Sequence, residues 1–320
     1  MYRHAQATPC QLGPNNIVTG DIGTLKDSAD RIRVWQPSGI NSYQMNWFSE
    51  DCGRASDVLV GDPDNDGEKE ILIFAWTTVK SKGSQETRIF FKTYEQGSTG
   101  ASSESSPYFL GGPGWDTDGV IADVDSDGKS EVIAITVSRL VIYGHASSGY
   151  VIEFASPLLT ARRQVEGAVG NVDLDPELEI VTTTYDDGKG GTVLVWNRQA
   201  DGTWTYQEAE SVASLSVYKA RIGNVDGDAT PEIVGVTSNY DTKETYFLVW
   251  ESTVNGYNLQ SVQKSDLDGD ATAWGASLGD MNGDSRAELC WEPPEFQGKP
   301  WCGPSEGAAG PCCGASTTPP

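Results

Sequence analysis

Short apolar runs recur along the chain, and acidic turns separate them. Each repeat has the same order: an apolar run, an acidic loop, a glutamate, a β-branched run, a turn, and a strand that ends in an aromatic residue. The β-branched runs stand at residues 70–74, 131–135, 179–183, 232–236 and 288–291. Runs of this length and composition are typical of buried strands. The pattern therefore predicts an all-β fold.

Further strands follow each of these runs in the same order. Third strands are predicted at residues 88–91, 139–143, 192–196 and 246–250, and fourth strands begin at Tyr150, Trp204 and Tyr257. At the N-terminal end, the second, third and fourth strands are matched, without an acidic loop, by residues 16–20, 31–35 and 43–47. The sequence therefore divides into six repeats, at residues 10–53, 54–112, 113–158, 159–212, 213–265 and 266–300.

Repeats of this size predict a β-propeller. A four-stranded sheet alone would expose both faces, so neighbouring sheets pack face to face and a closed ring covers the end faces. We expect one propeller domain over residues 1–300, with six blades of four antiparallel strands, closed near the two termini. Five or seven blades are alternatives, and a β-sandwich is the structural competitor, although sandwiches do not require regular repeats. Residues 301–320 are predicted to form a Cys-, Pro- and Thr-rich tail or linker.

Five acidic loops share one pattern of oxygen-bearing side chains, with Asp or Asn at loop positions 1, 3 and 5 and Glu at position 9. We number them loop 1 (62–70), loop 2 (123–131), loop 3 (171–179), loop 4 (224–232) and loop 5 (280–288). In that order, the candidate ligands are Asp62, Asp64, Asp66 and Glu70; Asp123, Asp125, Asp127 and Glu131; Asn171, Asp173, Asp175 and Glu179; Asn224, Asp226, Asp228 and Glu232; and Asp280, Asn282, Asp284 and Glu288.

Alternating oxygen ligands on a tight turn converge on a hard cation, and a backbone carbonyl near position 7 completes the shell. Ca²⁺ accepts about six to eight oxygens in irregular geometry, which suits these loops better than the strict octahedron of Mg²⁺. The absence of His and Cys at these spacings argues against zinc and copper. The alternative is that the Asp and Asn side chains only form Asx-turns, without a metal.

These ordered loops resemble the FG-GAP/VCBS repeat, the unit of integrin α-chain propellers and of several propeller lectins. The resemblance covers roughly residues 10–295. In that family, positions 1, 3, 5 and 9 bind Ca²⁺ between the first two strands of a blade, and the resemblance implies the same role for the candidate ligands. Position 9 is commonly Asp in the integrin form, whereas here it is always Glu.

Two loops depart further from the pattern. Loops 3 and 4 carry Pro176 and Ala229 in place of glycine at position 6, so we expect these two sites to bind more weakly. A sixth acidic segment, at residues 266–270, has the same spacing but meets Trp274 at position 9. We therefore interpret that segment as a turn.

The composition excludes some partners. The formal net charge is −24, from 46 acidic and 22 basic residues. Such a surface repels phosphate backbones, which argues against nucleic acid and anionic lipid. The even count of six cysteines suits disulfides in an oxidising compartment. No stretch reaches the ~20 apolar residues of a membrane span, and the first residues lack the apolar run of a signal peptide, so an exported protein would begin before this numbering.

The sequence contains no GxSxG elbow, no phosphate-binding glycine loop and no HExxH motif. Its two histidines, His4 and His145, lie far apart, and His145 is interpreted as a surface or inter-blade residue. A Ca²⁺-dependent polysaccharide lyase is the enzymatic alternative. Its base would come from the clustered or strand-borne basic residues, which we interpret as solvated surface charge: Arg162, Arg163, Lys219 and Arg221.

The tryptophans fall into two groups. Those that recur at the end of the third strand are predicted to pack between blades: Trp35, Trp196 and Trp250. Those at strand ends or in loops are candidates for stacking on sugars or meeting a protein: Trp47, Trp76, Trp115, Trp204 and Trp274.

The sequence therefore predicts a non-catalytic, extracellular or cell-surface Ca²⁺-binding propeller that serves in adhesion, recognition or assembly. Its expected partner is a protein or a glycan at the cell surface, or copies of itself, without nucleic acid and without direct membrane insertion. The alternatives are a structural subunit of a surface filament that a neighbouring subunit completes, a carbohydrate-binding lectin, and the lyase.

Overall fold

A computed structural model describes much of the chain between residues 12 and 302. The described residues are 12, 15–20, 31–40, 42–52, 54–81, 84–110, 117–159, 163–173, 175–185, 190–213, 215–238, 242, 244–265, 275–292 and 301–302. Within them every regular element is a β-strand, and none is a helix that could cross a membrane. The prediction of an all-β fold is confirmed.

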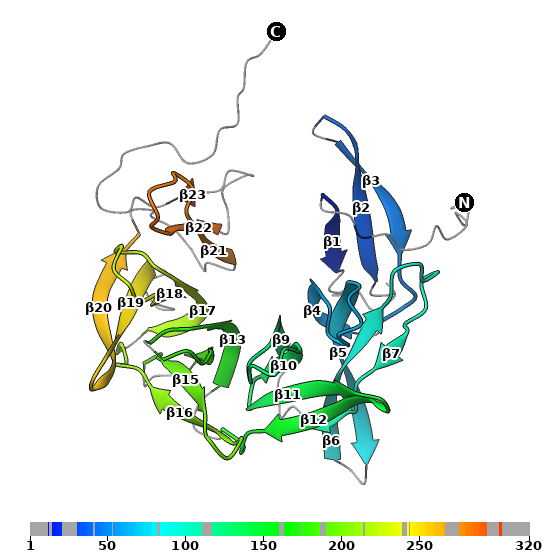
Figure 1. Ribbon diagram of the computed structural model, residues 1–320, viewed down its shortest axis with the longest axis horizontal. Helices are drawn as coiled ribbons and strands as arrows, with labels where there is room; N and C mark the ends of the chain where they lie inside the picture. The colour runs from blue at the N-terminus through cyan, green and yellow to red at the C-terminus, as the bar shows by residue number, and fades with distance from the viewer. Residues whose placement is uncertain are drawn as a thin grey trace. The chain divides into compact units, whose positions relative to one another are not determined.

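The strands form six antiparallel sheets in the described part of the chain (Figure 1). The first three sheets contain β1 (Ile17–Gly20), β2 (Ile32–Gly39) and β3 (Ser42–Phe48); β4 (Arg54–Gly61), β5 (Glu70–Ser81), β6 (Ser84–Tyr94), β7 (Glu104–Ser105) and β8 (Phe109–Leu110); and β9 (Thr117–Ala122), β10 (Glu131–Thr136), β11 (Arg139–Ala146) and β12 (Gly149–Ala155). The other three contain β13 (Arg163–Gly170), β14 (Glu179–Tyr185), β15 (Val193–Arg198) and β16 (Trp204–Glu208); β17 (Ser216–Gly223), β18 (Glu232–Ser238), β19 (Thr245–Thr253) and β20 (Gly256–Lys264); and β21 (Gly275–Gly279), β22 (Glu288–Glu292) and β23 (Trp301–Cys302).

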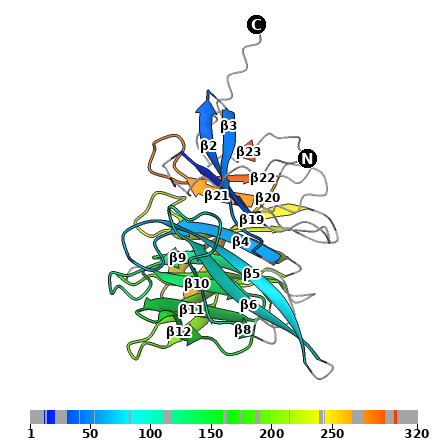
Figure 2. The same ribbon diagram turned by 90° about the vertical axis from the view of Figure 1, so that its right-hand side faces the viewer.

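The chain divides into two compact units, Met1–Thr160 and Ala161–Pro320, each with three sheets. Hydrogen-bonded neighbours within a sheet follow chain order, as β9–β12 shows in Figure 2. In the second sheet, β7 and β8 share the fourth place beside β6. Pro107 lies between these two short strands and has no N–H to donate, which interrupts the ladder.

Within each unit, the first strand of one sheet lies against the first strand of the next. In the first unit β4 contacts β1 and β9, and in the second unit β17 contacts β13 and β21. The apolar cores lie between these neighbouring sheets rather than inside a closed barrel wall. Strands buried on both faces need continuous apolar runs, and all six residues of β10 are buried.

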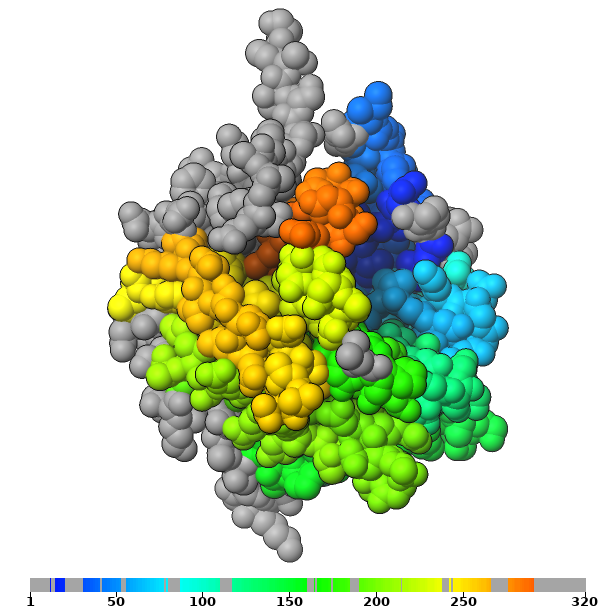
Figure 3. Space-filling model, turned by 60° about the vertical axis from the view of Figure 1, so that its left-hand side comes forward, coloured from blue at the N-terminus to red at the C-terminus, as the bar shows by residue number. Residues whose placement is uncertain are grey.

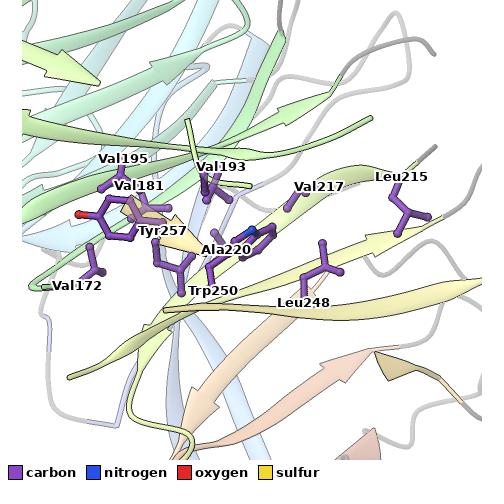
Figure 4. Close-up of a cluster of buried hydrophobic side chains, with 12 residues drawn as sticks. Val172, Val181, Val193, Val195, Leu215, Val217, Ala220, Leu248, Trp250 and Tyr257 are labelled. Atoms are coloured by element: carbon purple, nitrogen blue, oxygen red, sulfur yellow. The ribbon is translucent and has the colours of Figure 1, made fainter. Parts of the chain in front are cut away.

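Trp250 is the largest side chain in the core between the β13–β16 and β17–β20 sheets (Figure 4). It is fully buried, and its Nε1 donates a hydrogen bond to the Glu210 carbonyl at 2.8 Å. The ring lies over Gly235, where a Cβ would come within 2.6 Å of it, so this strand position requires glycine. Trp196 is also buried, and inter-sheet packing is confirmed for Trp250.

Two of the tryptophans named as candidates for contacting sugars or a protein are buried. Trp47 is 2% exposed and Trp204 is 7% exposed. Trp47 packs edge-on against Tyr94 with ring centroids 5.8 Å apart, in the core cluster that also contains Ile71. Trp76 packs partly buried against the core of the first unit. The remaining two members of that group, Trp115 and Trp274, lie outside the described residues.

Cys52 is a buried thiol with its Sγ 3.1 Å from Ser49 Oγ, and it has no disulfide partner among the described residues. β22 and β23 place Cys290 opposite Cys302 in the strand register. The cysteines at positions 10, 312 and 313 lie outside the described residues.

Candidate metal centres

Each acidic loop joins the first two strands of a sheet. Loop 1 connects β4 to β5, loop 2 connects β9 to β10, loop 3 connects β13 to β14, loop 4 connects β17 to β18, and loop 5 connects β21 to β22. The turns need left-handed backbone at position 4, where Asn65, Ser126, Gly227 and Gly283 have φ of 64°, 62°, 89° and 82°. Asn, Ser and Gly tolerate this conformation better than β-branched residues do.

The loops bring their carboxylates together. In every loop, three acidic side chains offer oxygen atoms that all lie within 4.8 Å of one another. The groups are Asp62, Asp64 and Asp66; Asp123, Asp125 and Asp127; Asp173, Asp175 and Glu179; Asp226, Asp228 and Glu232; and Asp280, Asp284 and Glu288. Five clusters of this kind have the geometry to hold a metal ion.

The Asx-turns that were weighed as the metal-free alternative are also present. In all five loops the N–H of position 5 donates to Oδ1 of position 3, at 2.8–3.2 Å. The N–H of position 7 donates to Oδ1 of position 5, at 2.7–3.0 Å. Each of these side chains therefore uses one oxygen to fix the turn. In loop 5, Asn282 Nδ2 also donates to Asp284 Oδ2 at 3.1 Å and to Glu288 Oε1 at 2.6 Å.

The position-9 glutamates are the most buried acidic residues of the loops, and those of loops 3 to 5 belong to the clusters, whereas Glu70 and Glu131 do not. Glu70, Glu131, Glu179, Glu232 and Glu288 are 0–5% exposed. In loops 2 to 5, Oε2 accepts the N–H of loop position 2 at 2.7–2.9 Å. This hydrogen bond closes the loop onto the start of the second strand, and Oε1 of Glu232 is buried without a hydrogen-bond partner.

Burial raises the pKa of the position-9 carboxyl groups in loops 1 to 4, and the neighbouring aspartates raise it further. The pKa of Glu70 rises to about 8 through burial and then the charges of Asp64 and Glu95. Burial also raises the pKa of Glu131 and of Glu179 to about 7, against the N–H groups that lower them. The pKa of Glu232 is raised for the same reason. Each rise measures how unfavourable the charged form is here.

A divalent cation fits this donor set. Among the described residues, none of the five glutamates forms a salt bridge. Those of loops 3 to 5 lie within the acidic clusters, and the charges of Asp64 and Asp125 act on Glu70 and Glu131. Buried carboxylates need a cation or a set of hydrogen bonds to offset lost hydration. Hard oxygen donors in irregular arrangement match Ca²⁺. Positions 1, 3, 5 and 9 would hold the ion, which would supply the missing positive charge.

Loops 3 and 4 differ from the other three at position 1. In loops 1, 2 and 5, the N–H of position 6 donates to Oδ2 of the position-1 aspartate at 2.9–3.0 Å. In loops 3 and 4, the position-1 side chains are amides, and Nδ2 of Asn171 and Asn224 donates to the carbonyl of Asp175 and Asp228. An amide brings one neutral oxygen, so the expectation of weaker binding gains a structural reason.

Two tyrosines that the sequence analysis did not single out lie beside the clusters. The hydroxyl of Tyr257, at the start of β20, is 3.5 Å from Asp173 Oδ2 in loop 3 of the preceding sheet. Tyr150 holds the same strand position in β12, and after burial the charge of Asp64 is the largest cause that raises its pKa. An aromatic residue at the first position of the fourth strand was the signal that could have identified both.

Neighbouring loops are joined directly. Asn65 in loop 1 donates from Nδ2 to the Ser130 carbonyl at 3.2 Å and accepts the Ser130 N–H on Oδ1 at 2.6 Å. Ser130 precedes Glu131 in loop 2. In the second unit, the Ala287 N–H of loop 5 donates to the Asn224 carbonyl of loop 4 at 2.7 Å. A change in one loop can therefore reach the next.

The interpretation of the four basic residues as solvated surface charge is wrong for Lys219 and Arg221, which pair with a buried carboxylate. Lys219 Nζ lies 2.8 Å from Glu166 Oε2, and Arg221 Nη2 lies 3.1 Å from Glu166 Oε1. Glu166 is 6% exposed, and a buried carboxylate without cations would be unfavourable. The side chains of Arg162 and Arg163 lie outside the described residues.

His145 pairs with Glu104 of the preceding sheet, with Nε2 and Oε2 3.0 Å apart, which confirms an inter-sheet position. Its ring also lies 4.8 Å from that of Tyr150. His4 and the acidic segment at 266–270 lie outside the described residues.

No family model matches the chain, and no curated protein matches it. Several solved structures are similar at low identity. A protein from Lactobacillus plantarum has 11% identity and a TM-score of 0.48, over 87% of this chain and 76% of that one. The V. cholerae biofilm matrix protein Bap1 has 16% identity and a TM-score of 0.43, over 82% of this chain and 40% of Bap1. The rhamnogalacturonan lyase YesW has 14% identity and a TM-score of 0.38, over 72% of this chain and 57% of the lyase. The chain thus spans little more than half of that lyase.

Proposed function

We propose that this chain is a calcium-stabilised β-propeller of the FG-GAP/VCBS type that acts outside the cell as a recognition or adhesion module. The observation that carries the proposal is the recurrence of a buried glutamate beside clustered carboxylates, once in each of five sheets. One such cluster is common on protein surfaces, but five at the same strand junction indicate a shared ligand. Its role is structural, because the ion neutralises carboxylates that otherwise repel one another.

The order of the strands supports the proposed propeller. Each sheet is an antiparallel meander, and first strands of neighbouring sheets contact each other within each unit. In a propeller the first strands line the axis and the sheets pack face to face. The six sheets are the proposed blades. Strands β1–β3 form the blade without an acidic loop.

The ion pairs of the basic residues favour a binding function over catalysis. A lyase needs a basic group that can accept a proton, but Lys219 and Arg221 both pair with Glu166. Both cationic groups are thus engaged with a buried carboxylate. We therefore propose a non-catalytic module whose partner is a surface protein or glycan or a second copy of the chain.

The test is to present the chain, in Ca²⁺ and after chelation, to immobilised panels of glycans and surface proteins, and to measure its mass in solution. Saturable Ca²⁺-dependent binding supports the recognition function. Head-to-tail polymers without other ligands would favour the filament subunit instead. Unsaturated sugar products from an acidic polysaccharide would overturn the non-catalytic assignment.

A further inference from the structure

A polar cavity of about 530 Å³ opens on the second unit between two hairpins. One wall comes from the β15–β16 hairpin and the other from the β19–β20 hairpin. In the space-filling view, yellow and orange residues of β19–β20 lie beside the yellow-green residues of β15–β16 (Figure 3). The volume falls in the range of small-molecule sites, which is roughly 300–1,000 Å³.

The chemistry of the lining is that of a neutral hydrogen-bonding site. Four carboxamides line the cavity, those of Asn197, Gln199, Gln207 and Asn255, together with the hydroxyls of two threonines and a serine. Its one formal charge is the carboxylate of Asp173, and no lysine or arginine lines it among the described residues. The described lining therefore offers no cationic side chain to pair with an anionic ligand, and a lipid would find little apolar surface.

Tyr206 supplies an exposed aromatic face at the cavity. Its side chain is 43% exposed, while the ring lies 4.8 Å, centroid to centroid, from the buried ring of Trp196. Trp196 is itself fixed, because its Nε1 donates to Thr182 Oγ1 at 3.1 Å. Tyr206 thus contacts a buried ring, tilted by 54° to its own, and remains partly exposed. Aromatic rings with one apolar face free and polar groups around them are typical of binding sites.

The polar walls are held in place before any ligand arrives. Gln199 Nε2 donates to Thr205 Oγ1 at 2.9 Å, and Thr253 Oγ1 donates to the Gly256 carbonyl at 2.8 Å. Gly256 has φ of +106°, and a Cβ there would come within 2.1 Å of Gln207 Nε2. This glycine lets the two hairpins approach closely. Pre-organised side chains lose less conformational entropy on binding.

We propose that this cavity binds a neutral oligosaccharide, with one sugar ring stacked on Tyr206 and its hydroxyls hydrogen bonded by the surrounding carboxamides. Sugars present both a C–H face and a set of hydroxyls that donate and accept, and amides can satisfy both roles. The inference rests on the proposed recognition function and names the ligand class of that function. Asp173 belongs to loop 3 as well, so the site adjoins a candidate metal centre.

The test uses the full chain in Ca²⁺ on an array of neutral and uronic-acid oligosaccharides, followed by calorimetric titration of the strongest neutral one. Tyr206→Ala is expected to weaken binding about tenfold or more, since truncating a central aromatic contact typically costs over ~1.4 kcal/mol. Gln207→Ala, a milder change on the exposed wall, is expected to weaken it as well. The matched control is Tyr108→Ala, because Tyr108 is 59% exposed and also packs on a ring, that of Phe90, at 5.1 Å.

The outcomes separate the inference from the function that it rests on. Weaker neutral-sugar binding by both pocket variants, with unchanged melting temperature and an unaffected Tyr108→Ala control, supports the site. Sugar binding that neither pocket variant changes, or a preference for uronic acids, overturns the site but leaves recognition standing. Binding to proteins alone also overturns the site. Binding to nothing, with Ca²⁺ present, overturns both.

Discussion

Pro63 occupies the loop position from which the other four loops hydrogen bond their buried glutamate, and neither carboxylate oxygen of Glu70 has a hydrogen-bond partner. Proline has no N–H to donate. In loop 2, the Val124 N–H donates to Glu131 Oε2 at 2.9 Å. The pKa of Glu70 is raised to about 8, whereas the pKa of Glu131 is raised to about 7. Loop 1 is therefore the loop whose charge most needs a cation.

Glu70→Gln is expected to stabilise the metal-free protein and to reduce the stabilisation that Ca²⁺ adds. The substitution removes a buried charge without hydrogen bonds, whose desolvation costs about 1–3 kcal/mol, and it removes a ligand of loop 1. Thermal unfolding of the dialysed protein at pH 8, with and without Ca²⁺, measures both effects. Glu131→Gln is the control, because its remaining oxygen can still accept the Val124 N–H, and it should give a smaller gain. A lower metal-free melting temperature for Glu70→Gln would contradict this account of loop 1.

The stability of the metal-free protein is expected to fall as the pH rises from about 4.5 to about 8. Glu70 has a folded-state pKa near 8 and an ordinary value of 4.5, so the folded state holds more protons over this window. Under that condition, raising the pH lowers the free energy of unfolding. Melting temperatures of dialysed protein at several pH values measure the slope. A variant with Gln at positions 70, 131 and 179 should flatten it, and an unchanged slope in that variant would assign the effect to general repulsion.

Asn224→Asp is expected to strengthen Ca²⁺ binding at loop 4 by about tenfold, because affinity in oxygen sites rises with ligand charge. The change replaces the Nδ2 donor, which bonds the Asp228 carbonyl, by a second carboxylate oxygen. Calorimetric titration with Ca²⁺ compares the variant with the parent chain. Asp123→Asn in loop 2 is the reverse exchange and should weaken one site by a similar factor. If neither exchange changes any binding constant, position 1 is not a ligand.

Asn65→Gly is expected to destabilise the first unit and to make loops 1 and 2 bind Ca²⁺ more independently. Glycine keeps the left-handed backbone at φ of 64° but removes both hydrogen bonds to Ser130. Each lost bond costs about 0.5–1.5 kcal/mol. Ser126→Gly is the matched control, since Ser126 holds the same loop position at φ of 62°. Equal effects of the two substitutions on stability would show that the Asn65 side chain contributes nothing.

The sequence was sufficient for the strands and the loops because their signals are local. A β-branched run after Glu179 predicts a buried strand, and β14 begins at that residue. The spacing of Asp62, Asp64 and Asp66 on one turn predicts that their carboxylates meet, and they do. Repetition strengthened both signals, because each pattern occurs several times along the chain.

Contacts between sheets were not predictable in the same way. Trp204 is buried because other residues pack over it, and the order of strands along the sequence does not reveal which residues those are. The pairing of Lys219 with Glu166 joins residues on β17 and β13, which no sequence spacing links. Tyr257 reaches Asp173 across the same kind of interface. Side chains that act across sheets are visible only once the sheets are assembled.

The most direct test of the account is the thermal unfolding of one preparation after exhaustive chelation, then with millimolar Ca²⁺, and then with the same concentration of Mg²⁺. Each site filled at a hundred times its Kd adds about 2.7 kcal/mol to the free energy of unfolding. We predict a large rise in melting temperature with Ca²⁺, saturating at several ions per chain, and a small one with Mg²⁺. An unchanged melting temperature in all three conditions would contradict the claim that cations hold the acidic loops together.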